Sequence, residues 1–324
     1  MKIESPTGSS PSRPAIAAAI AVLVVVWAVN FIAAKIGLLY LLPLAMSSFR
    51  VVLAGTVMIP VYFSCLKLKA FTEAADLRRR GFAGRDYWTF FYLGFFGVVV
   101  NQMCFTIGLH FTSVGHAAVI VGLGPIYILA LAVLLRLERA TGHKVVGMLM
   151  ALFGVAVLAS ENGISAPSAS IEGDAITMAG SVGFAIYAVL GKRVAERYDT
   201  LTITAFGHFA GALIVLPVAL LECNKLFSSG NWPIPWKAWA AILYMSVFSS
   251  ALAYVFYFWL LRYMEASQLS AFTYLLPVLA TVLGILWLGE KGSWRQVLGG
   301  VTALGGVYWI ESGRATAVKA NTVT

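Results

Sequence analysis

The chain has 324 residues, of which 60% are hydrophobic and only 11% are charged, against about a quarter charged in ordinary soluble domains. A soluble fold could not hide that much apolar surface. The apolar residues come in blocks of about 20, and each block is long enough to cross ~30 Å of hydrocarbon as a helix. The composition therefore indicates a helical membrane protein and excludes a soluble globular domain.

The formal net charge of +9 would fit a nucleic-acid partner only if the basic residues clustered on one surface. They fall instead in short loops between apolar blocks, where membrane topology explains them, so no nucleic-acid partner is expected. The cysteines Cys65, Cys104 and Cys223 are widely spaced and form no CxxC pair or zinc pattern. They are interpreted as packing residues, and neither a metal nor a cofactor is expected.

The apolar blocks predict ten membrane-spanning helices. In chain order they cover residues 15–36, 44–64, 88–108, 112–135, 145–160, 174–191, 202–222, 237–260, 267–288 and 294–311. The first block follows Lys2 and Arg13, as the apolar region of a signal peptide would. It is too long for such a region and similar blocks follow it, so it is interpreted as a retained helix.

The loops predict the topology. Most of the 23 Lys and Arg residues fall in segments that share one side of the membrane if the chain starts in the cytoplasm. The outer loop from Glu161 to Asp174 has none. Because Lys and Arg accumulate on the cytoplasmic side, both termini are predicted to be cytoplasmic.

An internal repeat divides the chain into two units. Residues 109–160 align without a gap with residues 261–312, and the identical pairs include Pro125 with Pro277 and Glu138 with Glu290. Five helices per unit is an odd number, so the second unit must enter the membrane from the opposite side. The predicted fold class is thus an all-α membrane protein with ten transmembrane helices in two inverted five-helix repeats. This architecture lets one site open alternately to either face.

The repeat also sets the expected domain boundaries. They are a cytoplasmic N-terminal tail over residues 1–14, a first five-helix repeat over 15–160, an outer linker over 161–173, a second five-helix repeat over 174–312 and a cytoplasmic C-terminal tail over 313–324. Gly207 and Gly211 form a GxxxG motif, which could serve packing within the chain or a homodimer.

Pro125 and Pro277 lie near the middle of two predicted spans, at matching positions of the repeat. Each removes a helix hydrogen bond and frees the carbonyl four residues earlier, at Val121 and Thr273. Freed carbonyls at membrane depth are tolerated where protein or a wet cavity satisfies them. The pair predicts two hinges beside a midplane cavity, and the alternative is a pair of kinks that improve packing.

Polar and aromatic side chains at membrane depth are the candidate solute-binding groups, because a buried polar group costs free energy unless it is paired or hydrated. They either line one central pocket or form interhelical hydrogen bonds. The candidates are Trp27, Asn30, Arg50, Asn101, Tyr187, Ser250, Tyr254 and Tyr274. Arg50 is the only basic residue well inside a span. It either attracts an anionic or carboxylate-bearing solute or extends to the membrane surface.

Two histidines at depth, His116 and His208, are either proton carriers near neutral pH or hydrogen-bonded packing residues. No Asp or Glu lies deep in a predicted span, which disfavours a carboxylate proton relay and a dedicated site for polycations. A cation could still bind against the ring faces of Trp27 or Tyr254.

Several segments carry a family resemblance. They are residues 27–35, 49–50, 109–118, 249–254, 260–263, 275–278 and 288–291. In these segments the chain resembles the drug/metabolite transporter superfamily, specifically its EamA-type transporters with ten helices in two repeats. The sequence departs from that pattern at residues 136–139, where a Leu-Gly-Glu-Arg type of end is usual, and at His116, where a small polar residue is expected. The resemblance implies transport of amino acids, other metabolites, toxic compounds or, as in eukaryotic relatives, nucleotide sugars and triose phosphates.

The sequence therefore predicts a secondary transporter that exports small organic metabolites such as amino acids, by alternating access at a midplane cavity. The expected location is a bacterial cytoplasmic membrane. Within transport, the alternatives are phosphorylated sugars, nucleotide sugars or cationic drugs. From other classes, the alternatives are an intramembrane enzyme or a non-transporting scaffold. The sequence has no HExxH or GxSxG motif and no group of acids within a span that would support an enzyme.

Overall fold

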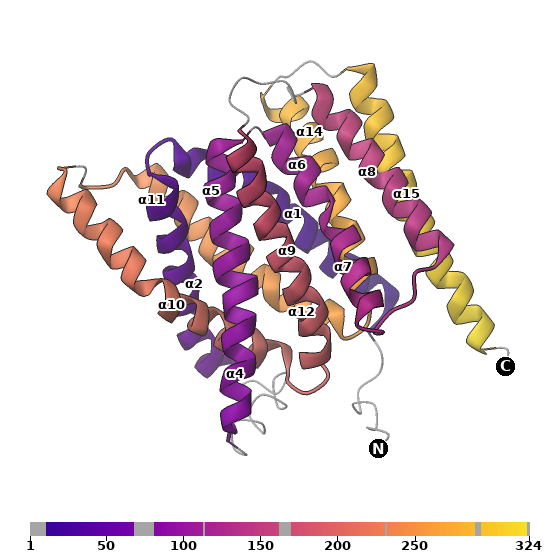
Figure 1. The fold of residues 1–324 in the computed structure, drawn as a ribbon, viewed down its shortest axis with the longest axis horizontal. Coiled ribbons are helices and arrows are strands. Elements are labelled where there is room, and N and C mark those ends of the chain that lie inside the picture. Colours follow the sequence, from indigo (N-terminus) through magenta and orange to yellow (C-terminus); the bar gives the residue numbers. More distant parts are fainter. Residues whose placement is uncertain are drawn as a thin grey trace.

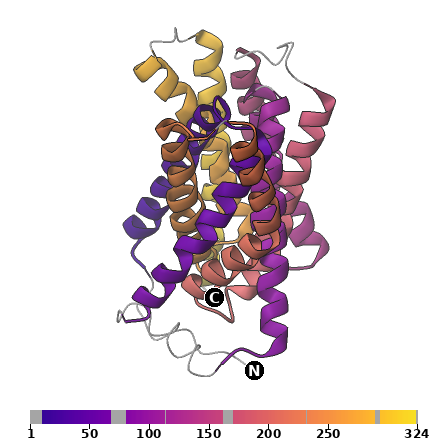
Figure 2. The ribbon, with the colours of Figure 1, turned by 90° about the vertical axis from the view of Figure 1, so that its left-hand side faces the viewer.

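The computed structural model describes residues 11–67, 81–112, 114–161, 170–230, 232–288 and 293–322. Every regular element in these ranges is a helix. The helices form one bundle, in which α10 and α15 occupy opposite edges (Figure 1). A view turned by a right angle shows that most helices run lengthwise through the bundle and that some cross it at a tilt (Figure 2). The prediction of an all-α membrane protein is confirmed.

The first five spans follow the predicted segmentation. They are α1 (Arg13–Leu38), α2 (Pro43–Cys65), a third span built from α4 (Gly84–Leu93), η2 (Gly94–Met103) and α5 (Cys104–Phe111), a fourth built from α6 (Val114–Gly122) and α7 (Gly124–Leu134), and α8 (Gly142–Glu161).

The second five spans repeat this pattern. They are α9 (Ile171–Val194), α10 (Thr200–Ser228), an eighth span built from α11 (Trp236–Tyr244), η3 (Met245–Leu252) and α12 (Ala253–Leu261), a ninth built from α13 (Ala266–Ala271), η4 (Phe272–Tyr274) and α14 (Leu275–Leu288), and α15 (Trp294–Thr322). Within the described ranges, seven of these spans are helices that are long and apolar enough to cross a membrane. The fourth and ninth are broken, and the tenth helix continues past the predicted end at residue 311.

The crossing of α8 and α15 shows that the two repeats are inverted. A methyl group added to Gly154 would lie 2.6 Å from the Gly299 carbonyl oxygen, and one added to Gly147 would lie 2.8 Å from the Gly306 carbonyl oxygen. In the repeat, Gly147 corresponds to Gly299 and Gly154 to Gly306. Gly147 therefore lies against the equivalent of Gly154, and Gly154 lies against the equivalent of Gly147. This crossed pairing occurs only if α8 and α15 run in opposite directions.

The first helices of the two repeats are also antiparallel, and their ends define the two ends of the bundle. The Lys35 ammonium, near the end of α1, donates to the Leu109 carbonyl at 3.3 Å, and α9 begins beside Phe111 through the bond from Ser170 N to Phe111 O at 3.1 Å. We call this the linker end. The opposite end, where α1 begins and α15 finishes (Figure 1), is called the terminal end.

At the terminal end, Lys192 repeats the role of its counterpart Lys35. Its ammonium donates to the carbonyl of Leu261, the repeat equivalent of Leu109, and to that of Met264 at 2.9 Å. A cation at the last carbonyls of a helix is favoured by the helix dipole. Both lysines therefore hold helix ends together rather than reach out to headgroups.

Small residues serve packing inside the chain. A methyl group on Gly94 of η2 would lie 2.5 Å from the Gly207 carbonyl oxygen and 2.8 Å from the Gly211 amide nitrogen. Gly94 and Gly211 thus let the third span and α10 approach closely, because a carbon added to Gly211 would also lie 2.8 Å from the Val98 side chain. A carbon added to Gly207 meets no atom within 4 Å, so only one glycine of the GxxxG motif is needed for packing within the chain.

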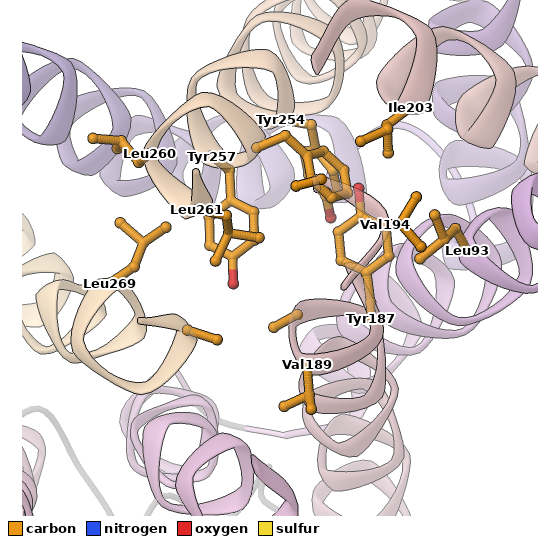
Figure 3. Close-up of a cluster of buried hydrophobic side chains, with 14 of the residues drawn as sticks. Leu93, Tyr187, Val189, Val194, Ile203, Tyr254, Tyr257, Leu260, Leu261 and Leu269 are labelled. Atoms are coloured by element: carbon orange, nitrogen blue, oxygen red, sulfur yellow. The ribbon is translucent and has the colours of Figure 1, made fainter. Parts of the chain in front are cut away.

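The largest buried cluster fills the terminal half of the bundle and separates the midplane from the terminal end. We call its centre the tyrosine cluster: Tyr187 from α9, Tyr254 and Tyr257 from α12, and the leucines Leu261 and Leu269. The three tyrosines face one another (Figure 3), and the ring centroids of Tyr187 and Tyr254 are 5.5 Å apart. This cluster forms a floor beneath the cavity described next.

Candidate functional site

A cavity of about 100 Å³ lies at the centre of the bundle, on the linker side of the tyrosine cluster. Five of the eight predicted solute-binding residues line it: Trp27, Asn30, Arg50, Asn101 and Tyr254. They come from four different spans, so only the folded bundle brings them together. The sequence prediction of one central pocket thus agrees with where these five side chains lie, and their binding role stays a prediction.

The remaining wall residues were not among the eight solute-binding candidates, although Val121, Pro125 and Thr273 belong to the predicted hinges beside a midplane cavity. They include Phe31, Gln102, Phe105, Thr177, Ser181, Phe184, Ser270 and Thr273. Three of them, Thr177, Ser181 and Phe184, lie on α9 at spacings of three and four residues, which places them on one helix face. This spacing of two hydroxyls and an aromatic ring is visible in the sequence and could have identified one polar face of the helix.

Two π-helical segments position the polar wall. η2 carries Asn101 and Gln102, and η3 carries Ser249 and Ser250. They occur in the third span of each repeat, so the same irregularity appears twice. A π-helix is rare and frequently marks a functional site, because its wider turn leaves backbone groups and side chains in positions that an α-helix cannot reach.

Arg50 is buried on α2, with 4% of its surface exposed. Its Nε donates to the Ser250 hydroxyl at 3.1 Å, and that hydroxyl donates in turn to Gln102 Oε1 at 2.8 Å. The arginine therefore faces the cavity rather than the membrane surface. Within the described ranges no carboxylate pairs with it. A buried guanidinium without a counter-charge is costly, which makes it a strong attractor for an anionic group.

A second polar chain crosses the floor of the cavity. The Tyr254 hydroxyl lies 3.1 Å from both Asn101 Oδ1 and the Gly97 carbonyl oxygen. Asn101 Nδ2 donates to the Gly180 carbonyl at 3.1 Å, which links the third span to α9. These bonds fix the orientation of the amide and the phenol before any solute arrives.

Two buried polar atoms of cavity-lining side chains lack a hydrogen-bond partner in the described structure. They are Asn30 Oδ1, which is an acceptor, and Gln102 Nε2, which is a donor. An unpaired buried polar atom costs about 1–3 kcal/mol. A solute that carries both an N–H donor and an oxygen acceptor would satisfy them, and aromatic rings such as Trp27 and Phe184 supply an apolar surface beside them.

Three predicted residues lie outside the cavity wall. Ser250 stands behind Arg50 as its hydrogen-bond acceptor. Tyr187 packs under Tyr254 in the tyrosine cluster. Tyr274 is fully buried against α8 and α15, in a cluster with Met148 and Ala303.

Of the two candidate proton carriers, only His208 has a described side chain, and it does not line the cavity. His208 is fully buried on α10. Its Nδ1 lies 2.9 Å from the Thr204 carbonyl oxygen, and its ring meets the Tyr254 ring edge-to-face with centroids 5.0 Å apart. It therefore lies one side chain away from the cavity. The side chain of His116 lies outside the described residues.

Helix breaks accompany both predicted hinge prolines. Pro125 lies in the first turn of α7, directly after the break at Leu123, and it lines the cavity. Pro277 lies in the first turn of α14, after the η4 turn, and is half-buried outside the cavity. Val121 and Thr273, whose carbonyls the prolines free, both line the cavity. The hinge role stays a prediction.

Among the described residues, no three or more His, Cys, Asp or Glu side chains lie together as a group that could hold a metal ion. The cavity instead offers one buried cation, one unpaired donor, one unpaired acceptor and aromatic rings.

Comparisons with known proteins agree with this picture. The model of the EamA-like transporter family matches residues 14–160 and 171–312. An uncharacterized transporter of Archaeoglobus fulgidus is 30% identical over 89% of this chain and 96% of its own length. The uncharacterized transporter YyaM of Bacillus subtilis is 29% identical over 86% of this chain and 87% of its own length.

Two further likenesses concern a named relative and the fold. A protein of Streptantibioticus cattleyicolor, named a probable terminal-alkyne amino-acid exporter, is 24% identical over 66% of this chain and 69% of its own length. One solved crystal structure superposes with a TM-score of 0.69 at 20% identity, covering 92% of this chain and 96% of the other. At that identity the superposition supports the fold alone.

Proposed function

Because the chain belongs to the EamA-like transporter family, we propose that it carries small carboxylate-bearing metabolites such as amino acids across the membrane, in the direction of export. It is an integral membrane protein, and its relatives are named transporters. The proposed compartment is the cytoplasmic membrane of a bacterium, with the terminal end inside. This orientation follows from the sequence, in which Lys and Arg accumulate in the segments predicted to share a side with both termini.

The observation that carries the proposal is Arg50. Its guanidinium is 4% exposed and lines the cavity. No carboxylate among the described residues pairs with it, so its positive charge is not compensated within the site. A solute carboxylate can supply the compensating negative charge and form charge-assisted hydrogen bonds, which are stronger than neutral ones. The ammonium of an amino acid would then donate a hydrogen bond to the unpaired acceptor Asn30 Oδ1.

The size of the cavity favours a small solute over the larger alternatives. Its volume of about 100 Å³ is below the ~300–1,000 Å³ of sites that take drug-sized ligands. Nucleotide sugars need the upper part of that range. One relative is named an amino-acid exporter, which supports the same class of solute.

The proposed mechanism is alternating access, in which the two inverted repeats rock about the cavity. The helix breaks before Pro125 and Pro277 are the hinges of this motion, because a broken helix can bend without the loss of further backbone hydrogen bonds. Replacing both prolines by alanine should slow transport while the protein still assembles. Unaltered transport in that variant would remove the hinge role.

The experiment that tests the solute class is a thermal-shift screen of the purified protein against amino acids, phosphorylated sugars, nucleotide sugars and quaternary amines. A ligand that binds the folded state raises the melting temperature. We expect the rise with amino acids and its loss in Arg50→Leu, with partial retention in Arg50→Lys. A rise only with quaternary amines, kept in Arg50→Leu, would contradict the proposal. An enzyme would alter the solute chemically in the same detergent sample, and a carrier leaves it intact.

A further inference from the structure

A buried ion cluster lies at the terminal end, well outside the cavity. The Lys144 ammonium, in the first turn of α8, lies 2.9 Å from Glu138 Oε2 and 2.8 Å from Glu265 Oε2. The side chains of Lys144 and Glu138 are each 5% exposed, and that of Glu265 is 45% exposed. A buried pair of this kind is unlike the exposed pairs common at membrane surfaces, because the loss of either partner leaves an unpaired buried charge.

Glu138 also holds the start of the ninth span. Its Oε1 accepts from the Ser267 amide at 3.2 Å, and its Oε2 accepts from the Ser267 hydroxyl. The carboxylate therefore joins the end of the fourth span to the first turn of α13. We call these four residues, Glu138, Lys144, Glu265 and Ser267, the terminal lock.

A sharp turn of the backbone before Glu138 places its carboxylate beside α13. Arg136 adopts a positive φ of 55°, a left-handed conformation that residues other than glycine rarely adopt. The turn folds the chain back, so that Leu137 N donates to the Ala132 carbonyl at 2.8 Å. Such conformations persist only where the surrounding structure demands them.

The lock joins two elements that both reach the cavity. α7 carries Pro125 and Ile128 on the cavity wall, and α13 carries Ser270. Between the cavity and the lock lies the tyrosine cluster, which includes Leu269 of α13. A solute can leave toward the terminal end only if α7 and α13 move apart, and this motion must break the bonds of Glu138.

The repeat places a different side chain at the position that is equivalent to Lys144. Glu290 corresponds to Glu138 and lies outside the described residues. Gln296 stands where the first repeat has Lys144. Its Oε1 accepts from Ser293 N at 3.0 Å, and its own N–H donates to the Ser293 hydroxyl at 3.1 Å, so it caps α15. At this one pair of equivalent positions, an ammonium in the first repeat is replaced by a neutral amide in the second.

From these contacts we propose that the terminal lock is the gate of the transporter at the terminal end, and that the two ion pairs of the buried Lys144 make the terminal-closed conformation the resting state. The inference rests on the proposed alternation of access and adds which end is shut at rest and which residues shut it. Breaking the lock shifts the population toward the terminal-open conformation, because only the terminal-closed conformation contains these bonds.

The test reads the conformation directly and needs no solute. A single cysteine is introduced by Ser270→Cys, a nearly isosteric change on the cavity wall, after Cys65, Cys104 and Cys223 are replaced by alanine. The protein is placed in sealed vesicles of known orientation. A membrane-impermeant maleimide is then added to the terminal side or to the linker side, and the labelling rate is measured from each.

We expect Lys144→Met and Glu138→Gln to raise labelling from the terminal side at least tenfold and to lower it from the linker side. Glu265 is half-exposed, and water weakens its ion pair with Lys144. Glu265→Gln should therefore change the ratio of the two labelling rates no more than about threefold. Lys225→Met is the matched control. It removes an ion pair of 2.6 Å with Glu222 on α10 and should leave the ratio unchanged.

The opposite changes on the two sides separate gating from damage. A misfolded variant would label faster from both sides. That result, or an unchanged ratio in both Lys144→Met and Glu138→Gln, would contradict the proposal that the terminal lock is a gate. Failure of the proposed solute class leaves this readout intact, because labelling involves no solute. The two proposals can therefore fail independently.

Discussion

The α8–α15 crossing and the central cavity are built from the same duplication but have diverged differently. At the crossing, equivalent positions keep the same residue, as Gly147 and Gly299 do, and each glycine packs against the backbone of the other repeat. At the cavity, equivalent positions differ: Asn30 and Arg50 line the wall, whereas their counterparts Tyr187 and Gly207 do not. Symmetric packing therefore supports the scaffold, whereas the side chains around the cavity do not keep the symmetry of the repeat.

The largest expected effect comes from filling a glycine contact at the crossing. In Gly154→Leu the new side chain would overlap the Ala303 amide nitrogen, which lies 2.4 Å from the position of the first added carbon. Backbone cannot give way as a flexible side chain can, so we expect a loss of stability at the upper end of the usual range for overpacking, about 3 kcal/mol. Thermal unfolding in detergent should show a much lower midpoint and little assembled protein.

The matched change at the cavity is Gly124→Leu. A carbon added to Gly124 meets no atom within 4 Å, and Gly124 lines the cavity. The unfolding midpoint should stay within a few degrees of the wild type, while solute binding is blocked because the leucine occupies the site. Equal destabilisation by the two leucines would show that the crossing and the cavity do not differ as described.

A smaller effect is expected at the polar wall. Gln102→Leu removes the acceptor of the Ser250 hydroxyl at 2.8 Å and the unpaired donor Nε2. The loss of one such bond to a solute is worth about 1–1.5 kcal/mol, so the dissociation constant of the solute should rise roughly tenfold. Titration calorimetry measures this, and Thr56→Val is the control, because the Thr56 hydroxyl bonds only its own helix at Val52. Unchanged affinity in Gln102→Leu would place the solute elsewhere in the cavity.

The smallest effect concerns the two equivalent lysines. Lys35→Met and Lys192→Met each remove an ammonium from the carbonyls at a helix end, a contribution of about 1 kcal/mol. Lys192→Met should cost somewhat more, since Lys192 bonds two carbonyls and Lys35 bonds one. The two sites lie at opposite ends of the bundle, so their effects on unfolding should add in the double variant. Strong non-additivity would mean that the ends are coupled in a way the static structure does not show.

The scaffold was predictable from the sequence because its signals are long and redundant. Apolar blocks of membrane length and the register of Pro125 with Pro277 indicate ten spans and an inverted repeat. Five cavity residues could also be named, because an unpaired polar group at depth is conspicuous in an apolar helix. The structure added the directions in which those groups point.

The local departures from α-helix could not be predicted. Nothing in the composition of Gly94–Met103 or Met245–Leu252 distinguishes a π-helix from an α-helix, because the difference lies in which carbonyl each N–H selects. Tyr274 illustrates the consequence at the η4 turn. Three residues per turn in a 3₁₀ segment advance each side chain further around the axis than an α-helix does, and Tyr274 packs toward α8 and α15 instead of lining the cavity.

The most direct test of the central claim is solute counterflow in proteoliposomes. Vesicles loaded with an unlabelled amino acid from the binding screen are diluted into a trace of the same amino acid in radiolabelled form. A carrier that alternates around one cavity exchanges the two, so labelled solute should accumulate transiently inside the vesicles above its outside concentration, and Arg50→Leu should abolish the overshoot. Uptake that only approaches the outside concentration without an overshoot, or no uptake at all, would contradict the account.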